Sequence, residues 1–345
     1  MSGFTCPVPF TSQDVIQLAH GGSGRVAQRL LDQVFRPALG NPVLDERHDS
    51  ATLSFAGGRL AYTTDGFVVH PWRFPGGNIG SLAVHGTVND LAMAGARPLA
   101  MSVAFILEEG LLFADLAEIV ACMQKAAEQA GVSVVAADTK VVERGRADGI
   151  YICASGIGEV VSKAPILPTS IQEGDAVVVS GDLGRHGAAV MTARDGLEVD
   201  PPIESDSAAV HEPALALLNA GLDVHCFRDV TRGGLATILN EIASEGQVGI
   251  RIEEDLVPVR EDVSSVCEIL GLDPLYVAFE GRFVAFVPEA QVDEAIRLLR
   301  GYEVSAGAKI IGHVGGVKGR VTMKGRIGVE RVLDLLSGEQ LPRIC

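Results

Sequence analysis

The sequence predicts an α+β protein of two mixed domains that ends in a short tail. The chain has 345 residues, which is about the length of two ordinary domains. Strand-like and helix-like patterns alternate along it without the strict βαβ repeat of a doubly wound sheet. A stretch with two prolines, 162–174, divides these patterns into two groups.

The patterns divide the chain into four segments. Residues 1–44 are expected to form a Gly-rich lead-in with one helix, because a Gly-Gly-Ser-Gly run opens onto helical spacing that ends at Pro37. Residues 45–162 and 170–335 form the two domains. Residues 336–345 are expected to form a mobile C-terminal tail.

Individual elements follow from periodicity and turn signals. Strands at 51–56 and 60–64 flank a Gly-Gly pair and predict a hairpin. The other elements expected in the first domain are helices 78–94 and 113–130 and strands 99–107, 132–136 and 150–155. Those expected in the second domain are strands 176–180, 249–252 and 282–287 and helices 186–194, 208–220, 235–245 and 291–299.

Composition argues against several classes of protein. A net charge of −16 is unfavourable for a nucleic-acid-binding surface. No apolar run approaches the roughly 20 residues of a membrane-spanning helix, and the first residues lack the pattern of a signal peptide. The six cysteines form no C-x-x-C pair, which argues against a structural zinc site. We therefore expect a cytoplasmic protein with reduced thiols that binds neither nucleic acid nor a membrane.

The chain ends on a cysteine, Cys345, in the sequence Leu-Pro-Arg-Ile-Cys. Thiolates are nucleophiles and group carriers, and a terminal position would let the thiol reach more than one site. A terminal cysteine can also be incidental, so this feature alone decides nothing. The adjacent α-carboxylate opposes thiolate formation and Arg343 favours it, so we expect a thiol that is not strongly activated.

Several aspartates stand where apolar runs meet polar or Gly-rich sequence, namely Asp49, Asp65, Asp90 and Asp138. Carboxylates brought together could hold Mg²⁺, which takes one or two per ion along with water and phosphates. Each could instead be a helix cap or a turn residue. Lys140 follows Asp138 by two positions, so in an extended segment both side chains would point to one side and could contact a phosphate. A surface ion pair is the alternative interpretation.

Three Gly-containing loops precede expected helices. The runs at 21–24 and 76–80 could present backbone N–H groups to an anion, but neither fits a P-loop or a Rossmann motif. The run at 229–234 places Thr231 at an expected helix start, where a simple cap is the alternative. Glu280 follows an apolar run at a bend and could be either a site residue or a turn residue.

Longer stretches are distinctive when taken in order: 64–80 (TDGFVVHPWRFPGGNIG), 85–92 (HGTVNDLA), 138–142 (DTKVV), 229–234 (DVTRGG) and 342–345 (PRIC). Together they resemble the HypE family, the carbamoyl dehydratases of nickel–iron hydrogenase maturation. This family is a branch of the superfamily of aminoimidazole ribonucleotide synthetase and selenophosphate synthetase. The chain departs from the family's usual pattern at Ala137 in place of Gly, at Ser23 in the leading loop, and at His48 in place of a second aspartate.

The resemblance implies an ATP- and Mg²⁺-dependent enzyme that dehydrates a carbamoyl group carried on Cys345, converting a thiocarbamate to a thiocyanate. The product would supply cyanide ligands for the hydrogenase iron. Matching positions imply Cys345, Lys140 and Glu280 as catalytic residues. The residues implied to bind ATP are Gly22, Gly24, Asn78, Asp138, Thr139, Lys140, Thr231, Arg232 and Gly233. The implied metal ligands are Asp49, Asp65, Asp90 and Asp138.

The resemblance also implies three kinds of partner: the carbamoyltransferase HypF, the iron-carrying HypC–HypD complex, and a second copy of this chain. The domain at 45–162 would bind ATP and metal and form the dimer. Two other functions are compatible with parts of the sequence. One is a small-molecule kinase or synthetase of the same superfamily, acting in selenophosphate or thiamine phosphate chemistry, and the other is a scaffold that displays the tail. The terminal cysteine favours the dehydratase, because a small-molecule enzyme would leave it dispensable.

Overall fold

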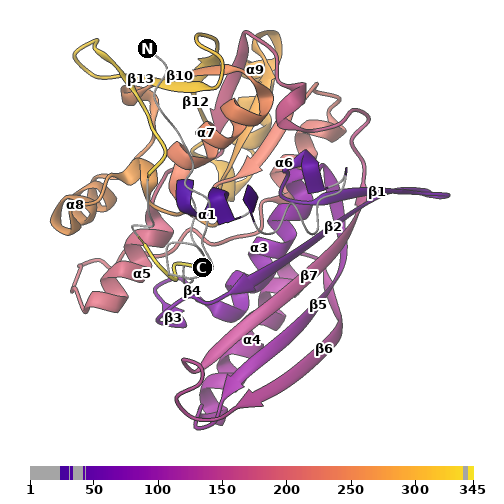
Figure 1. Ribbon diagram of the computed structural model, residues 1–345, viewed down its shortest axis with the longest axis vertical. Helices are drawn as coiled ribbons and strands as arrows, with labels where there is room; N and C mark the ends of the chain where they lie inside the picture. Colours follow the sequence, from indigo (N-terminus) through magenta and orange to yellow (C-terminus); the bar gives the residue numbers. More distant parts are fainter. Residues whose placement is uncertain (1–23, 31, 34–41, 43, 337–340) are drawn as a thin grey trace.

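The computed structural model describes residues 24–30, 32–33, 42, 44–336 and 341–345 (Figure 1). Most of the expected lead-in, with Gly22 and Ser23, lies outside these residues, as does part of the tail. The described part of the lead-in contains helix α1 (Arg25–Leu30). Among the described residues, no helix has the length and apolar character needed to cross a bilayer.

The first half of the chain forms a five-stranded sheet with the order β1-β2-β7-β5-β6. Its strands are β1 (Ala51–Phe55), β2 (Gly58–Phe67), β5 (Ala96–Glu108), β6 (Ser133–Val142) and β7 (Ile150–Val160). The expected hairpin is present, with Phe55 paired to Gly58 across the turn. Strands β5 and β6 pair in parallel, so they require a crossover connection, which contains helix α4 (Phe113–Gln129).

Strands β2 and β6 extend further than their apolar patterns predicted. As a result Asp65 and Asp138 lie inside strands, and the expectation that they mark strand ends was wrong. Each of these strands carries polar side chains on exposed positions, and apolar periodicity cannot follow a strand through such positions.

Helices α3 (Ile79–Met93) and α4 pack on one face of this sheet (Figure 1). Helix α3 begins at Asn78, whose side chain accepts hydrogen bonds from the backbone N–H groups of Gly80 and Ser81. Most residues of α3 are buried, because the helix packs on the sheet and also contributes to the core of the second half. On the opposite face of the sheet, side chains such as Cys153 are exposed.

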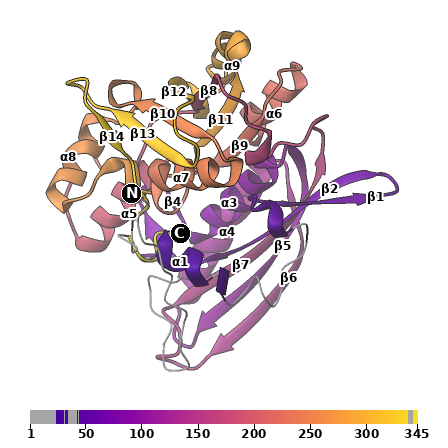
Figure 2. The ribbon, with the colours of Figure 1, turned by 45° about the horizontal axis from the view of Figure 1, so that its top comes forward.

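The second half forms a seven-stranded sheet with the order β14-β13-β10-β12-β8-β11-β9 (Figure 2). Its strands are β8 (Asp175–Val179), β9 (Cys226–Asp229), β10 (Gly249–Glu253), β11 (Phe283–Pro288), β12 (Lys309–Val314), β13 (Arg320–Lys324) and β14 (Glu330–Val332). Its helices are α5 (Arg185–Asp195), α6 (His211–Asn219), α7 (Gly234–Gly246), α8 (Glu261–Leu270) and α9 (Val292–Leu299). Helix α7 packs on one face of the sheet, and α6 and α9 pack on the other.

The sequence patterns did not predict β9, β12, β13, β14 or α8. The missed strands are short or irregular: β9 has four residues, and the pairing of β12 shifts register beside Gly312. Such strands are defined by the partners with which they pair more than by their own periodicity.

The described end of the tail lies in the core between the two halves. Leu341, Ile344 and Cys345 belong to the same buried cluster as Phe67 of the first half and Val190 of α5. Figure 2 shows the C-terminus between the two sheets. The structure thus gives the end of the tail a resting place, which the sequence alone did not provide.

Candidate active site

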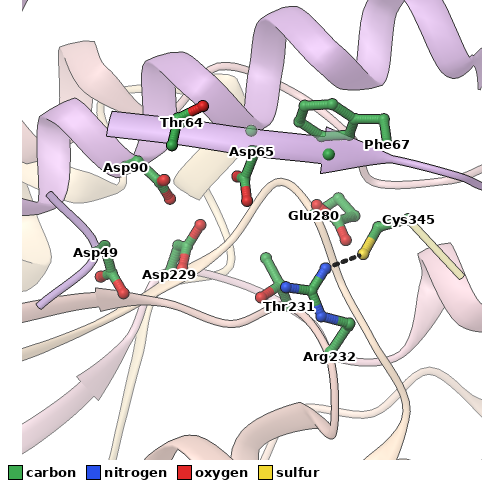
Figure 3. A pocket seen from close by; sticks show the side chains of 12 residues that line it. Asp49, Thr64, Asp65, Phe67, Asp90, Asp229, Thr231, Arg232, Glu280 and Cys345 are labelled. Carbon is green, nitrogen blue, oxygen red and sulfur yellow. Dashed lines mark hydrogen bonds between the residues drawn. The ribbon is translucent and has the colours of Figure 1, made fainter. Parts of the chain in front are cut away.

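An acidic pocket with a cavity of about 200 Å³ lies between the two halves, and the C-terminal residue forms part of its wall (Figure 3). The residues that line it are Asp49, Thr64, Asp65, Gly66, Phe67, Gly86, Asp90, Asp229, Thr231, Arg232, Glu280 and Cys345. Acidic side chains outnumber the single basic one in this lining, so the pocket favours a cation.

Four aspartates reach the pocket from different elements. Asp49 precedes β1, Asp65 lies in β2, Asp90 lies near the end of α3, and Asp229 ends β9. They converge because α3 packs against both β2 and β9. The carboxyl groups of Asp65, Asp90 and Asp229 point toward one another (Figure 3). The Thr63 hydroxyl donates a hydrogen bond of 2.5 Å to Asp90 Oδ2.

Burial raises the pKa values of these four carboxyls, and repulsion from neighbouring aspartates adds to the effect for Asp65, Asp90 and Asp229. Burial is the largest cause for Asp90, whose pKa lies well above 3.8, and the charges of Asp65, Asp229 and Asp49 add to it. Burial, followed by the charges of Asp49 and Asp65, likewise holds the pKa of Asp229 well above its usual value. Burial raises the pKa of Asp49 to about 6 and raises that of Asp65. A bound cation would offset both the burial of the ionised carboxylates and the repulsion between them.

Arg228 forms an ion pair with Asp49. Its side chain is only 7% exposed, and its Nη1 lies 3.1 Å from Asp49 Oδ1. The positive charge of Arg228 lowers the pKa of Asp49, although burial outweighs this effect. The neighbouring His48 is half-buried, and burial lowers its pKa to about 3. The family's second aspartate is therefore replaced here by a neutral side chain.

Cys345 is buried at the other side of the pocket. Its Sγ accepts a hydrogen bond of 2.8 Å from a guanidinium nitrogen of Arg232 (Figure 3). Burial raises the pKa of the thiol to about 12; Arg232 opposes this shift and Glu280 adds to it. The docked thiol is therefore protonated at neutral pH. The expectation of a thiol that is not strongly activated stays a prediction, for which burial provides the main physical cause.

Glu280 lies in the same pocket and is 3% exposed. Burial first, and then the charge of Asp229, hold its pKa well above 4.5. Its backbone N–H donates to Asp206 Oδ1 at 3.2 Å, and its carbonyl accepts from Asn89 Nδ2 at 3.1 Å. These bonds fix the backbone, while Oε1 has no hydrogen-bond partner among the described residues. A carboxyl held in this way beside Cys345 can accept or donate a proton.

The predicted residues Asp138, Thr139 and Lys140 do not reach this pocket. Strand β6 is three positions from β2 in the sheet, about 14 Å at the usual ~4.8 Å spacing of strands. The register across β7 and β5 aligns Asp65 with Ala137, so Asp138 points to the opposite face. Lys140 Nζ lies 2.6 Å from Asp138 Oδ2, and both side chains are exposed. In this chain they form the surface ion pair that the sequence left open as an alternative.

Three other predicted ATP-binding residues lie outside the pocket lining. Asn78 is used as the cap of α3. Gly24, at φ +99°, packs against Leu336, and a Cβ at this position would come within 2.7 Å of the Leu336 oxygen. Gly233 has a φ of 77° and precedes α7, directly after the pocket-lining Thr231 and Arg232.

The structure adds Asp229 to the group of candidate metal ligands. Sequence patterns did not single out this residue, because strand β9, which it ends, was not predicted. Had the four-residue strand been recognised, Asp229 would have stood at the end of an expected strand and been grouped with the other aspartates.

Comparisons with known proteins identify the family. Profiles described as "AIR synthase related protein" match the chain in tandem, the N-terminal domain over 47–160 and the C-terminal domain over 172–324. A protein named carbamoyl dehydratase HypE from Rhizobium leguminosarum bv. viciae is 47% identical, covering 96% of this chain and 95% of that protein. The chain belongs to the HypE family of carbamoyl dehydratases. The HypE of Escherichia coli K12 is 41% identical, covering 96% of this chain and 99% of that protein.

Solved structures of the family agree with this fold. A HypE in complex with ATP is 43% identical, with a TM-score of 0.82, covering 96% of this chain and 100% of that chain. The structure of a HypE–HypF complex matches with a TM-score of 0.85 at 42% identity, covering 89% of this chain and 99% of that chain. The predicted α+β class with two domains of the aminoimidazole ribonucleotide synthetase type is thereby confirmed. A ThiL complexed with AMPPCP and TMP, at 19% identity and a TM-score of 0.71, shares only the fold.

Proposed function

We propose that this protein is an ATP-dependent carbamoyl dehydratase whose substrate is its own Cys345, carrying a carbamoyl group. The observation that carries the proposal is the position of the terminal sulfur, which is buried in an acidic pocket beside Arg232 and Glu280. A family member at 43% identity has been solved in complex with ATP, which supports nucleotide use here. The thiocyanate product supplies cyanide ligands for the iron of nickel–iron hydrogenase.

Dehydration of the thiocarbamate must break a C–O bond and remove both N–H protons. The carbonyl oxygen of Cys–S–C(=O)–NH₂ takes the γ-phosphoryl group of ATP, which releases ADP and one proton and leaves an S–C(=NH)–O–phosphate. Departure of phosphate together with the second proton then leaves Cys–S–C≡N. Phosphoryl transfer depends mainly on positioning and charge neutralisation. This requirement matches a pocket of fixed carboxylates with one guanidinium.

The pocket aspartates fit Mg²⁺, which prefers carboxylate oxygens. Asp49 Oδ2 is buried and has no hydrogen-bond partner among the described residues. Among the described residues, no group of three or more His, Cys, Asp or Glu side chains is placed to hold a metal ion by itself. This suits Mg²⁺, because water and nucleotide phosphates usually complete its coordination. Held by one or two of the carboxylates of Asp49, Asp65, Asp90 and Asp229, the ion would neutralise the phosphates of ATP.

Glu280 is the base that we assign to the amide protons. It lies in the same pocket as Cys345, and its free Oε1 makes it available. Its raised pKa brings it closer to the working pH, where a general base is most effective. Arg232 is placed to hold the sulfur end of the substrate and to balance developing phosphate charge.

Lys140 and Asp138 belong to the site, in our proposal, through a second copy of the chain. In one chain they are exposed on a strand remote from the pocket. The sheet face to which Asp138 points also carries the exposed apolar side chains Tyr62 and Ile157, which are 44% and 38% exposed and paired with each other. An apolar sheet face of this kind is suited to contact between copies. A homodimer would then bring Lys140 of one subunit toward the pocket of the other.

The other partners follow from the family. The solved HypE–HypF complex supports HypF as the carbamoyltransferase that loads Cys345. Transfer of the cyano group to the iron-carrying HypC–HypD complex, and a cytoplasmic location, remain predictions from the resemblance.

Intact-mass spectrometry of the carbamoylated protein tests the proposal. Adding ATP and Mg²⁺ should remove one water, and peptide mapping should locate the loss on the peptide that contains Cys345. Cys345→Ser, which cannot receive the carbamoyl group on sulfur, is the control that identifies the modified residue. Asp90→Asn should keep the carbamoyl group and lose no water. An unchanged mass of the loaded wild-type protein after ATP and Mg²⁺ addition would refute the function.

A further inference from the structure

The docked tail is held chiefly through its main chain. The N–H of Val68 donates to the Cys345 oxygen at 3.0 Å, and the N–H of His70 donates to the Arg343 oxygen at 3.2 Å. Residues 341–345 therefore run beside the segment that follows β2. The spacing resembles strand pairing, in which main-chain hydrogen bonds provide affinity without regard to side chains.

Arg194, in the last turn of α5, ties this arrangement together. Its Nη1 and Nη2 donate to the carbonyl oxygens of Pro342 and Arg343 at 2.9 and 2.8 Å. Its Nε donates to the carbonyl oxygen of His70 at 2.8 Å. One guanidinium therefore joins the tail to the segment with which it pairs. Lysine could not reproduce this planar set of donors.

His186, in the first turn of α5, holds the residue before the cysteine. It is fully buried, and its Nε2 lies 2.7 Å from the carbonyl oxygen of Ile344. A carbonyl oxygen can only accept, so Nε2 carries the proton. Burial lowers the pKa of His186 to about 4, so the ring is neutral and Nδ1 accepts the hydroxyl proton of Ser205 at 2.8 Å. The Ile344 carbonyl thus sets the tautomer of His186, and the Ser205 hydroxyl accommodates it by donating to Nδ1.

The docked thiol is closed to any loading partner. Cys345 is 5% exposed, so a carbamoyltransferase can reach it only after the tail has left the pocket. The hydrogen bonds of Arg194 and His186 to the tail are made to carbonyl oxygens of residues before Cys345. These hydrogen bonds do not involve the sulfur, so they do not depend on whether it is free. By contrast, the Arg232 contact is made to the sulfur itself.

We propose that Arg194 and His186 are positioning residues that latch the tail in the pocket and so aim the loaded sulfur at the reacting groups. The dehydration part of this inference rests on the proposed function. The docking part does not, because it concerns only whether Cys345 is accessible.

The test measures accessibility and chemistry separately. Peptide-resolved mass spectrometry gives the rate at which iodoacetamide alkylates Cys345 in the full-length protein without nucleotide. Cys226, which is fully buried, serves in the same sample as the reference for global unfolding. Single-turnover loss of water from the carbamoylated protein gives the second readout.

Arg194→Lys and Arg194→Ala should raise Cys345 alkylation by about tenfold or more, since loss of about 1.4 kcal/mol of docking free energy corresponds to tenfold. Both should slow water loss by a similar factor. His186→Gln keeps an N–H donor and should stay near wild type, whereas His186→Leu should behave like Arg194→Ala. Arg297→Ala is the matched control, because Arg297 is exposed on α9 and pairs with Glu294.

Alkylation of Cys345 at the wild-type rate in Arg194→Lys and His186→Leu, with Cys226 protected, would overturn the latch. If Cys226 also became reactive in an Arg194 variant, that variant would be misfolded. The difference in Cys345 alkylation between His186→Gln and His186→Leu would then decide whether the latch exists. A wild-type protein that loses no water, but whose variants expose Cys345, would refute the dehydratase function and leave the latch standing.

Discussion

The sulfur of Cys345 lies 2.8 Å from a guanidinium nitrogen of Arg232, although the two residues are 113 positions apart in the chain (Figure 3). Arg232 follows β9 in the second half, and the tail must return to the centre of the molecule to reach it. The contact places one positive charge beside the atom that carries the substrate. Arg232 is therefore well placed to stabilise charge that develops during phosphoryl transfer.

Arg232→Gln should slow ATP-dependent water loss by about 10²-fold, because removing one group that stabilises developing charge costs about 10²–10³ in rate. Arg232→Lys keeps the charge but not the planar fork, and should be intermediate. Single-turnover intact-mass measurements on carbamoylated protein give these rates. A Gln variant that turns over like wild type would remove Arg232 from the mechanism.

Without a divalent cation, the four pocket aspartates should make the protein less stable as the pH rises. Burial raises the pKa of Asp49 from 3.8 to about 6 and that of Asp90 well above 3.8, so the folded state holds protons that the unfolded state releases. The stabilisation is complete at acid pH and is lost as the pH rises from 3.8 through about 6 and beyond. The side chain at position 90 cannot ionise in the Asp90→Asn variant. The melting temperature of this variant should therefore fall less with rising pH than that of wild type.

Thermal unfolding of both proteins across this pH range, with and without Mg²⁺, measures the difference. Mg²⁺ should raise the melting temperature of wild type at neutral pH and raise that of Asp90→Asn less. Superimposable pH curves for the two metal-free proteins would show that Asp90 is not part of the repulsive cluster.

Glu280→Gln should reduce water loss by at least about 10²-fold, because a positioned general base contributes about 10²–10⁴ in rate. In wild type the rate should rise with pH until Glu280 ionises, at a pKa that burial holds well above 4.5. The Gln variant should lack this rise and still bind ATP. A pH–rate profile of single-turnover water loss checks the first result, and nucleotide titration checks the second. A Gln variant with the wild-type profile would place the base elsewhere.

Mixed dimers can show whether Lys140 acts across subunits. Lys140→Ala and Glu280→Gln should each be inactive as a homodimer. If Lys140 serves the neighbouring pocket, a mixed dimer has one complete site, which combines Glu280 of the first chain with Lys140 of the second. Differently tagged chains, purified as heterodimers and assayed by loss of water, should then recover about half of the wild-type activity, one site of the two. Recovery of no activity would mean that Lys140 works within its own chain, and an active Lys140→Ala homodimer would mean that it has no role.

The sequence by itself determined most elements of the first half. Helix α3, expected over 78–94, spans Ile79–Met93, and α4, expected over 113–130, spans Phe113–Gln129. The signals that mark the ends of such helices, for example a capping residue such as Asn78, involve residues close together in the chain. They can therefore be recognised directly in the sequence. The motifs also pointed to Asp49, Asp65, Asp90, Glu280 and Cys345, all of which line one pocket.

Only the tertiary structure decided which candidates meet. It joined Asp229 to Asp49 and separated both from Asp138, whose strand register turns it to the opposite face. A shift of one residue along a strand reverses the face of a side chain, so the register of several strands must be known before any residue can be placed. The docking of Cys345 likewise depends on carbonyl oxygens held by Arg194 and His186. Backbone contacts of this kind leave no trace in residue type, and they exist only once both halves have packed together.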